Sequence, residues 1–92
     1  MIESFKHKGL KHLFEDDDRK LIQLELAERI STVLAYLDAA KAVEELNLPS
    51  LRLHPLKGEL KGFWSVTVRA NWRIIFRFVD GAVLDVELID YH

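Results

Sequence analysis

The spacing of the apolar residues changes near Pro49, and this change limits the folds that the chain can adopt. Before Pro49, apolar residues recur every three or four positions, namely Ile22, Leu26, Ile30, Val33, Leu34 and Leu37. Such spacing places them on one buried face of a long helix. We predict that this helix begins near Asp18, because the aspartates at 16–18 can cap free N–H groups and favour the positive end of the helix dipole. Three shorter elements are also predicted: a strand at 1–5 and helices at 6–15 and 40–46.

After Pro49 the sequence is typical of β-strands, because β-branched and aromatic residues dominate it. Four strands are predicted, at residues 51–56, 63–70, 72–79 and 82–89. The dipeptide Asp80-Gly81 between the last two strands is a strong hairpin signal. Helices followed by strands predict the α+β class, with N-terminal helices packed on a C-terminal antiparallel sheet of about four strands.

Side chains alternate between the two faces of a strand, which assigns the residues of the third predicted strand to faces. One set is apolar and is expected to face the helices: Trp72, Ile74, Phe76 and Phe78. The other set includes Arg73 and Arg77, so we expect the opposite face to be basic. In the last strand, one face is expected to hold Leu84, Val86 and Leu88. Trp64 and Trp72 are assigned to the core rather than to base stacking.

The length and composition exclude several classes of protein. A chain of 92 residues is expected to form one domain over residues 1–92, with little room for a second site. Cysteine is absent, which excludes a disulfide framework, a thiolate metal site and thiol chemistry. No apolar run approaches the roughly 18 residues of a membrane span, and residues 1–6 lack the apolar block of a signal peptide. We therefore expect a cytoplasmic protein with no membrane partner.

The formal net charge of −2 conceals three blocks of different sign. Residues 1–48 hold seven Lys and Arg against ten Asp and Glu, residues 49–79 hold six against one, and residues 80–92 hold none against four. The middle block therefore carries a local charge of +5. Local potential rather than the overall sum governs attraction to a phosphate polymer, so this block indicates a nucleic-acid substrate or partner.

The basic block and the last three residues contain the groups needed to cleave RNA without a metal or another cofactor. His54 and His92 can act as acid and base, because an unperturbed imidazole titrates near pH ~6.5 and can exchange a proton in either direction. Three cations can stabilise the charge of the phosphorane, and they are Lys57, Arg69 and Arg73. The sequence therefore predicts a metal-independent phosphodiesterase site.

Four segments carry a more specific pattern: S-F-K-H-K-G-L at 4–10, H-P-L-K-G at 54–58, G-F-W-S-V-T-V-R-A-N-W-R-I at 62–74 and I-D-Y-H at 89–92. In this order and spacing they resemble the HigB toxins of the RelE/ParE toxin superfamily. The resemblance spans nearly the whole chain, and D-Y-H at 90–92 is its most specific part. It implies the RelE-like microbial RNase fold.

The resemblance implies a toxin of a type II toxin-antitoxin system that inhibits translation and growth by cleaving mRNA in the A site of the 70S ribosome. The expected products are a 2′,3′-cyclic or 3′-phosphate and a 5′-hydroxyl. It also implies a HigA-type helix-turn-helix antitoxin, through which the complex would contact operator DNA.

The HigB pattern assigns catalysis to four residues and phosphate contact to two others. The catalytic set is His54, Asp90, Tyr91 and His92, and the phosphate contacts are Lys57 and Arg73. Asp90 would orient or charge a neighbour, and Tyr91 would stack on a base or donate a hydrogen bond. Our hypothesis makes His92 the base and His54 the acid, and the sequence leaves the reverse assignment open.

Other interpretations use fewer of these residues. A non-catalytic basic nucleic-acid-binding subunit of a repressor complex would use the cations and leave His54, Tyr91 and His92 idle. A toxin that has lost its activity is a third interpretation. Codon preference, cleavage of free RNA, the antitoxin surface and the oligomeric state are not determined by the sequence.

The remaining charged and titratable residues have simpler explanations. Arg52, Lys61 and Arg77 are assigned to general electrostatic attraction or to solvated charge rather than to catalysis. His7 and His12 stand five residues apart, whereas two ligands on one helix face stand three or four apart. A zinc site on the first helical segment is therefore not predicted.

Overall fold

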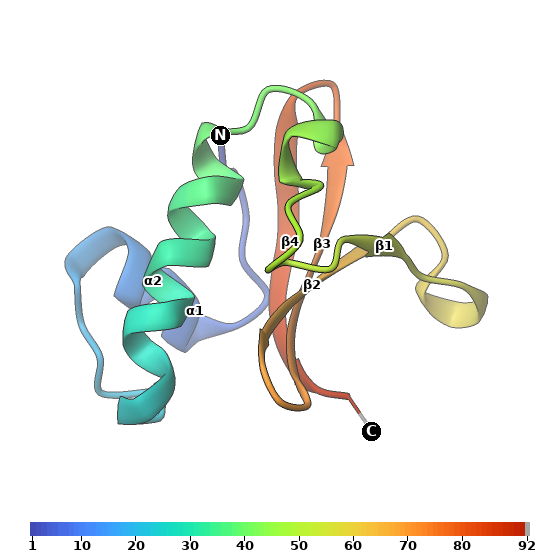
Figure 1. Ribbon diagram of the computed structural model, residues 1–92. Helices are drawn as coiled ribbons and strands as arrows, with labels where there is room; N and C mark the ends of the chain where they lie inside the picture. Colours follow the sequence, from blue (N-terminus) through green and yellow to red (C-terminus); the bar gives the residue numbers. More distant parts are fainter. Residues whose placement is uncertain (92) are drawn as a thin grey trace.

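The computed structural model describes residues 1–91, and its helices precede its sheet along the chain. The elements are α1 (Lys8–Asp16), α2 (Leu24–Ala39), the 3-10 helix η1 (Val43–Leu46), β1 (His54–Pro55), the 3-10 helix η2 (Gly58–Leu60), β2 (Trp64–Arg69), β3 (Trp72–Val79) and β4 (Ala82–Asp90). The strands form one antiparallel sheet in the order β1-β2-β3-β4. The two α-helices lie on one side of this sheet, whereas β1 and η2 extend away from them (Figure 1). The predicted α+β class is confirmed.

The hydrophobic core lies between α2 and the sheet. The predicted apolar face of α2 is almost fully buried and consists of Leu26, Ile30, Val33, Leu34 and Leu37. It packs against strand residues that include Val66, Ile74 and Phe76, each of which has no exposed surface. Burying one such side chain contributes about 1.5–3 kcal/mol relative to leaving it in water. No helix in residues 1–91 is both long and apolar enough to cross a membrane.

The start of the long helix differs from the prediction, because α2 begins at Leu24 and not near Asp18. The aspartates at 16–18 instead close α1 and form the turn that follows it. Asp17 adopts the left-handed conformation at φ 53°, and the Asp18 carboxylate accepts a hydrogen bond from the Lys20 N–H at 3.1 Å. Short acidic side chains form such local turns readily, and these turns compete with helix capping. Ile22 is buried as predicted, but it lies in the loop before α2.

A β-bulge in β4 overturns one predicted face assignment. Asp85 adopts a φ of 56°, and the register with β3 shifts between Ile75 and Arg77. Leu84 consequently lies opposite Arg77, while Val83 and Val86 are both buried in the core. An extra residue in one strand sends the following side chains to the other face, so strict alternation fails here. The predicted grouping of Leu84 with Val86 and Leu88 is therefore wrong.

The shorter elements are less regular than predicted. Residues 1–5 form only isolated parallel bridges, Ile2 to Val83 and Phe5 to Val86, along the free edge of β4. The predicted strand at 51–56 is reduced to His54–Pro55, and only the 3-10 helix Val43–Leu46 forms within residues 40–46. The first helix is confirmed as Lys8–Asp16, and the other strands lie close to their predicted bounds.

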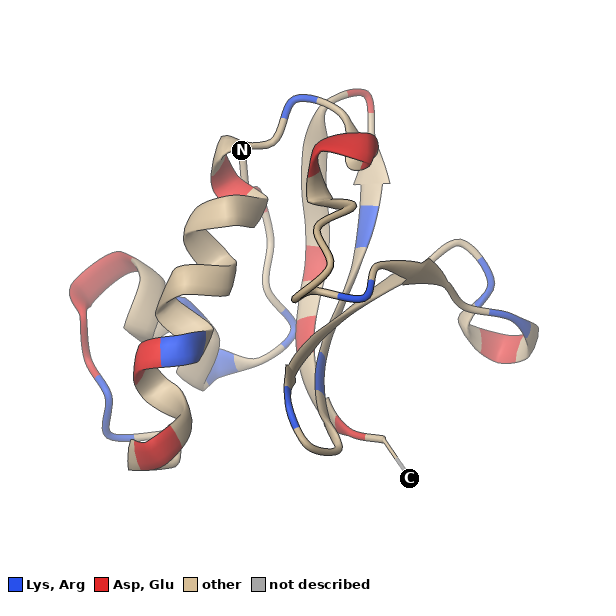
Figure 2. Ribbon diagram, viewed as in Figure 1, with Lys and Arg blue, Asp and Glu red and all other residues tan. Residues whose placement is uncertain are grey.

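The sheet face opposite the helices carries charges of both signs, so the predicted basic face is only partly correct. Arg77 Nε donates to Asp85 Oδ2 at 3.1 Å, which neutralises that arginine. Glu87 lies opposite Ile75, and Ile75 is itself buried on this face. Figure 2 shows Lys and Arg just before β1 and on either side of η2, with one acidic residue within η2.

Candidate active site

His54 lies on the sheet face that the helices leave open. In the strand register it pairs with Ser65, and Ser65 pairs with Ile75 on β3. Arg52 has a left-handed φ of 49°, and its carbonyl oxygen lies 3.1 Å from His54 Nδ1. Because a carbonyl oxygen can only accept, this hydrogen bond requires the proton on Nδ1. Proton exchange with a substrate is therefore left to the other ring nitrogen, Nε2.

Lys57 is positioned by the sharp turn that follows β1. It is the N-cap residue of η2, and its side chain is exposed. The next residue, Gly58, has a φ of 67°, a conformation that favours glycine. His54 and Lys57 are three residues apart in the H-P-L-K-G segment. Because the chain turns here, their imidazole and ammonium groups line the same cavity.

Tyr91 joins this turn from the far end of the chain. Its N–H donates to the Asn71 carbonyl at 2.7 Å, which extends the β3–β4 ladder by one residue beyond Asp90. A cavity of about 330 Å³ is lined by His54, Pro55, Leu56, Lys57, Leu60 and Tyr91. Three of the predicted site residues thus meet in one cavity, although Tyr91 is distant from the other two in sequence.

The apolar wall of this cavity was not predicted. Leu56 and Leu60 line it beside the polar groups, and the sequence prediction included neither residue. Their one sequence signal is their position on either side of Lys57, within the turn that carries the histidine. They give the cavity an apolar surface against which a base or a ribose can pack.

Arg73 lies next to the turn at the tip of the β2–β3 hairpin. Its register partners are Thr67 and Ile89, which puts it on the same sheet face as His54 and Ser65. Its Nη1 donates to the carbonyl oxygens of Ala70 and Trp72. The guanidinium therefore holds the hairpin in shape through Nη1, and within residues 1–91 its other N–H groups can still bind a second acceptor.

Two predicted residues remain to be placed. Asp90 ends β4, pairs with Trp72 in the register and is exposed. His92 lies outside the described residues. Within residues 1–91, His, Asp and Glu side chains do not gather in any group of three or more that could hold a metal ion.

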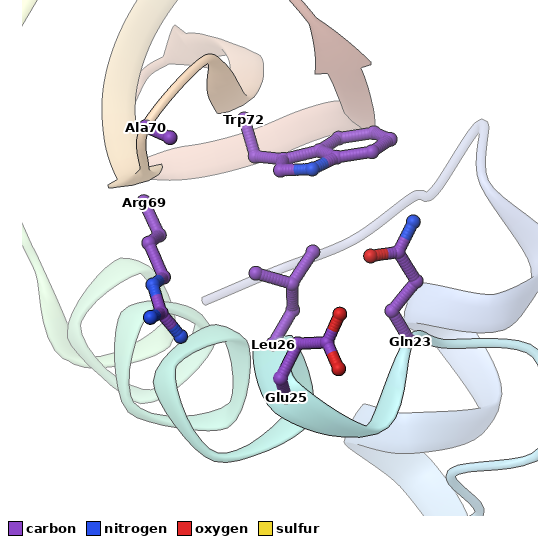
Figure 3. A pocket seen from close by; sticks show the side chains of 6 residues that line it. All are labelled: Gln23, Glu25, Leu26, Arg69, Ala70 and Trp72. Carbon is purple, nitrogen blue, oxygen red and sulfur yellow. The ribbon is translucent and has the colours of Figure 1, made fainter.

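Arg69 is not brought together with the other two predicted cations. A bulge in β2 pairs Thr67 with Arg73 but Arg69 with Trp72, so Arg69 turns toward the helical side of the sheet. There it lines a separate cavity of about 420 Å³ with Gln23, Glu25, Leu26, Ala70 and Trp72 (Figure 3). Trp64 and Trp72 pack against the core as predicted, but both are only partly buried, and Trp72 also lines this cavity.

Comparison with known proteins identifies the family. The profile described as RelE-like toxin of type II toxin-antitoxin system HigB matches residues 3–92. Endoribonuclease HigB of Proteus vulgaris is 48% identical over 92 residues, with 100% of both chains covered. Toxin HigB-1 of Vibrio cholerae is 39% identical over 90 residues, which cover 96% of this chain and 95% of that protein.

Two solved structures share the fold at low sequence identity. A point mutant of YafQ from E. coli has a TM-score of 0.61 at 20% identity, covering 96% of this chain and 89% of that one. The YoeB-YefM complex from Staphylococcus aureus has a TM-score of 0.60 at 16% identity, covering 100% of this chain and 95% of that one. These likenesses confirm the predicted RelE-like fold. Together with the family match over nearly every residue, they show that the chain belongs to the HigB family of RelE-like toxins of type II toxin-antitoxin systems.

Proposed function

We propose that this HigB toxin is an endoribonuclease that cleaves mRNA in the ribosomal A site by metal-independent acid–base catalysis. The observation that carries the proposal is the 330 Å³ cavity in which His54, Lys57 and Tyr91 meet. An imidazole, a fixed cation and a half-exposed phenol together can exchange a proton, neutralise a phosphate and contact a base. The relative from Proteus vulgaris is named an endoribonuclease, which supports the same activity.

The reaction is an attack of the ribose 2′-oxygen on the adjacent phosphorus. His92 takes the proton of the 2′-hydroxyl, the new P–O2′ bond forms, and the P–O5′ bond breaks. Protonated His54 gives its Nε2 proton to the departing 5′-oxygen, because its Nδ1 is held on the Arg52 carbonyl. The products are a 2′,3′-cyclic phosphate and a 5′-hydroxyl. Each positioned acid or base contributes about 10²–10⁴ in rate.

The other predicted residues act on charge and orientation. Lys57 and Arg73 stabilise the negative charge of the phosphorane, and Arg73 does so from the hairpin whose carbonyls it binds. Tyr91 stacks on the base next to the cleaved bond, and Asp90 orients His92. We assign the dependence on the ribosome to substrate positioning, because an open, half-exposed site by itself holds flexible RNA poorly.

The family implies an antitoxin partner, since its members belong to toxin-antitoxin systems. We propose a HigA-type helix-turn-helix antitoxin that neutralises the toxin in the cytoplasm and connects the complex to operator DNA. The YoeB-YefM structure is a complex of a protein with the same fold, which supports the idea that such folds bind partners.

The test is induced expression of the wild type, His54→Ala and His92→Ala, with transcript 5′ ends mapped during active translation. We expect cuts that keep codon register in the wild type and disappear in both variants, while circular dichroism shows all three folded. New ends that persist in both folded variants would contradict acid–base catalysis by these histidines. A folded wild type that produces no new ends would instead favour the non-catalytic nucleic-acid-binding interpretation.

A further inference from the structure

The 420 Å³ cavity lies between the first turn of α2 and the tip of the β2–β3 hairpin. The same hairpin tip also borders the proposed active site, because Asn71 accepts from the Tyr91 N–H and Ala70 accepts from Arg73. Ala70 in turn lines the larger cavity. The hairpin tip therefore connects the two cavities, because Ala70 lines the larger one and Asn71 binds the backbone of Tyr91, which lines the smaller one.

The walls of this cavity differ in chemistry from end to end (Figure 3). The indole of Trp72 lies on one side and the Leu26 side chain extends toward it from α2. The Arg69 guanidinium occupies one end, and the Gln23 amide and Glu25 carboxylate occupy the other. A flat aromatic surface, an apolar floor, a cation and two acceptors thus surround one space.

The charged groups of the cavity are not paired with other charges in the described part of the chain, although Glu25 lies in the first turn of α2. Within residues 1–91, neither Arg69 nor Glu25 forms a salt bridge, and both side chains are exposed. By contrast, the neighbouring Arg29 is occupied, since it donates to the carbonyls of Val68 at 3.3 Å and Ser50 at 3.3 Å. Arg69 is therefore available to a ligand, whereas Arg29 holds the fold together.

We propose that this cavity binds one nucleotide of the RNA strand that the toxin cleaves, next to the nucleotides held at the active site. The inference rests on the proposed function. The base stacks on Trp72, Arg69 binds a phosphate, and the Gln23 and Glu25 oxygens accept from the amino group of the base. A lone phosphate would fit poorly, because the Glu25 carboxylate repels it. The volume is also within the range of pockets that hold small organic ligands.

A direct test measures Trp72 fluorescence, with no cleavage required. In a full-length chain that carries Trp64→Phe and His54→Ala, Trp72 is the only indole. Titration with single-stranded RNA oligonucleotides of mixed sequence should quench this indole to saturation, and adding Arg69→Ala should weaken the affinity about tenfold. Lys41→Ala, which removes an exposed cation outside both cavities, should leave the affinity within about twofold. An unquenched Trp72 indole would overturn the proposal.

A second test reads the cut sites of the active toxin. Gln23→Ala and Arg69→Ala should still cut during translation, but with a changed base preference at one fixed position beside the cut. Identical preferences in the wild type, both variants and the Lys41→Ala control would overturn the inference while leaving the proposed function intact. If the wild type itself does not cut, the proposed function fails, and the fluorescence titration still decides whether the cavity binds RNA.

The competing occupant is a segment of the antitoxin. Co-expression of the toxin with its antitoxin distinguishes the two, because Arg69→Ala should leave co-purification of the antitoxin unchanged if the cavity holds RNA. Loss of the antitoxin from Arg69→Ala, together with wild-type base preference, would assign the cavity to the protein partner instead. Thermal unfolding of each variant by circular dichroism separates either result from a general loss of the fold.

Discussion

The two faces of strand β3 differ sharply, although their residues alternate along a single segment. Toward α2, Ile74 and Phe76 are completely buried among apolar side chains. On the other face, Arg73 binds the hairpin and Arg77 binds Asp85, and the strand register continues through β2 to His54. The difference teaches that the covered face builds the hydrophobic core, whereas the open face, on which Ile75 and Ser65 are also buried, carries the charged and titratable groups that chemistry needs. A substitution on one face should therefore affect a different measurement from a substitution on the other.

The largest effect on activity is expected from His54→Ala on the open face. Loss of a positioned proton donor should lower the rate of RNA cleavage by about 10²–10⁴. The free energy of unfolding should change by less than about 0.5 kcal/mol, because His54 is exposed. Cleavage rates and urea denaturation measure the two quantities. The matched control is His12→Ala on α1, which should leave cleavage intact. An equal loss of cleavage in both variants would contradict a specific role for His54 on the open face.

The largest effect on stability is expected from Phe76→Ala on the covered face. Removing a completely buried phenyl ring should lower the free energy of unfolding by about 3–5 kcal/mol. A domain of this kind has only about 5–15 kcal/mol in total, so much of the protein should unfold at growth temperature. Urea denaturation provides the measurement. Val79→Ala, an exposed position on the same strand, should cost below about 0.5 kcal/mol. A cost for Phe76→Ala below about 1 kcal/mol would contradict the assigned core.

A smaller effect is expected from Lys57→Ala, which removes an exposed cation from the active-site cavity. Binding to programmed ribosomes should weaken several-fold near physiological salt and recover in part at low salt. The slope of log affinity against log salt should become less steep by about 0.7–0.9, the contribution of one phosphate contact. Lys41→Ala serves as the control. An unchanged slope would show that Lys57 does not contact phosphate.

The smallest effect is expected from the ion pair between Arg77 and Asp85 on the open face. Their side chains are 41% and 34% exposed, so solvent screens the attraction. A double-mutant cycle with Arg77→Ala and Asp85→Asn should give a coupling of about 0.2–1 kcal/mol. Asparagine tolerates the left-handed backbone at Asp85, which keeps the bulge intact. A coupling above about 2 kcal/mol would show that the open face also holds the fold together.

The sequence predicted much of this architecture because its signals are periodic. The apolar face of α2 from Leu26 to Leu37 and the hairpin at Asp80-Gly81 both follow from spacing and turn chemistry, and both are confirmed. The start of α2 was wrong, because the aspartates at 16–18 form local turns as readily as helix caps. Leu84 was assigned to the wrong face, because the bulge at Asp85 interrupts a period of two.

The same contrast between local signals and bulges explains which residues of the candidate site could be brought together from the sequence. His54 and Lys57 lie within one segment, so their proximity follows from the turn at Gly58. Arg69 would share the open face with Arg73 if β2 alternated regularly. The bulge between Thr67 and Arg69 instead turns Arg69 toward α2. The sequence contains no signal strong enough to predict this bulge in β2.

The sequence by itself determined the class of elements, the apolar faces that build the core and the kinds of groups available for chemistry, because these depend on local spacing and residue type. Only the tertiary structure decided which groups meet. Pairing of β3 with β4 brings Tyr91 to the His54 and Lys57 turn, while the β2 bulge sends Arg69 to a second cavity. Strand register and bulges are set by packing across the whole sheet. A shift of the register by one residue moves a side chain to the opposite face.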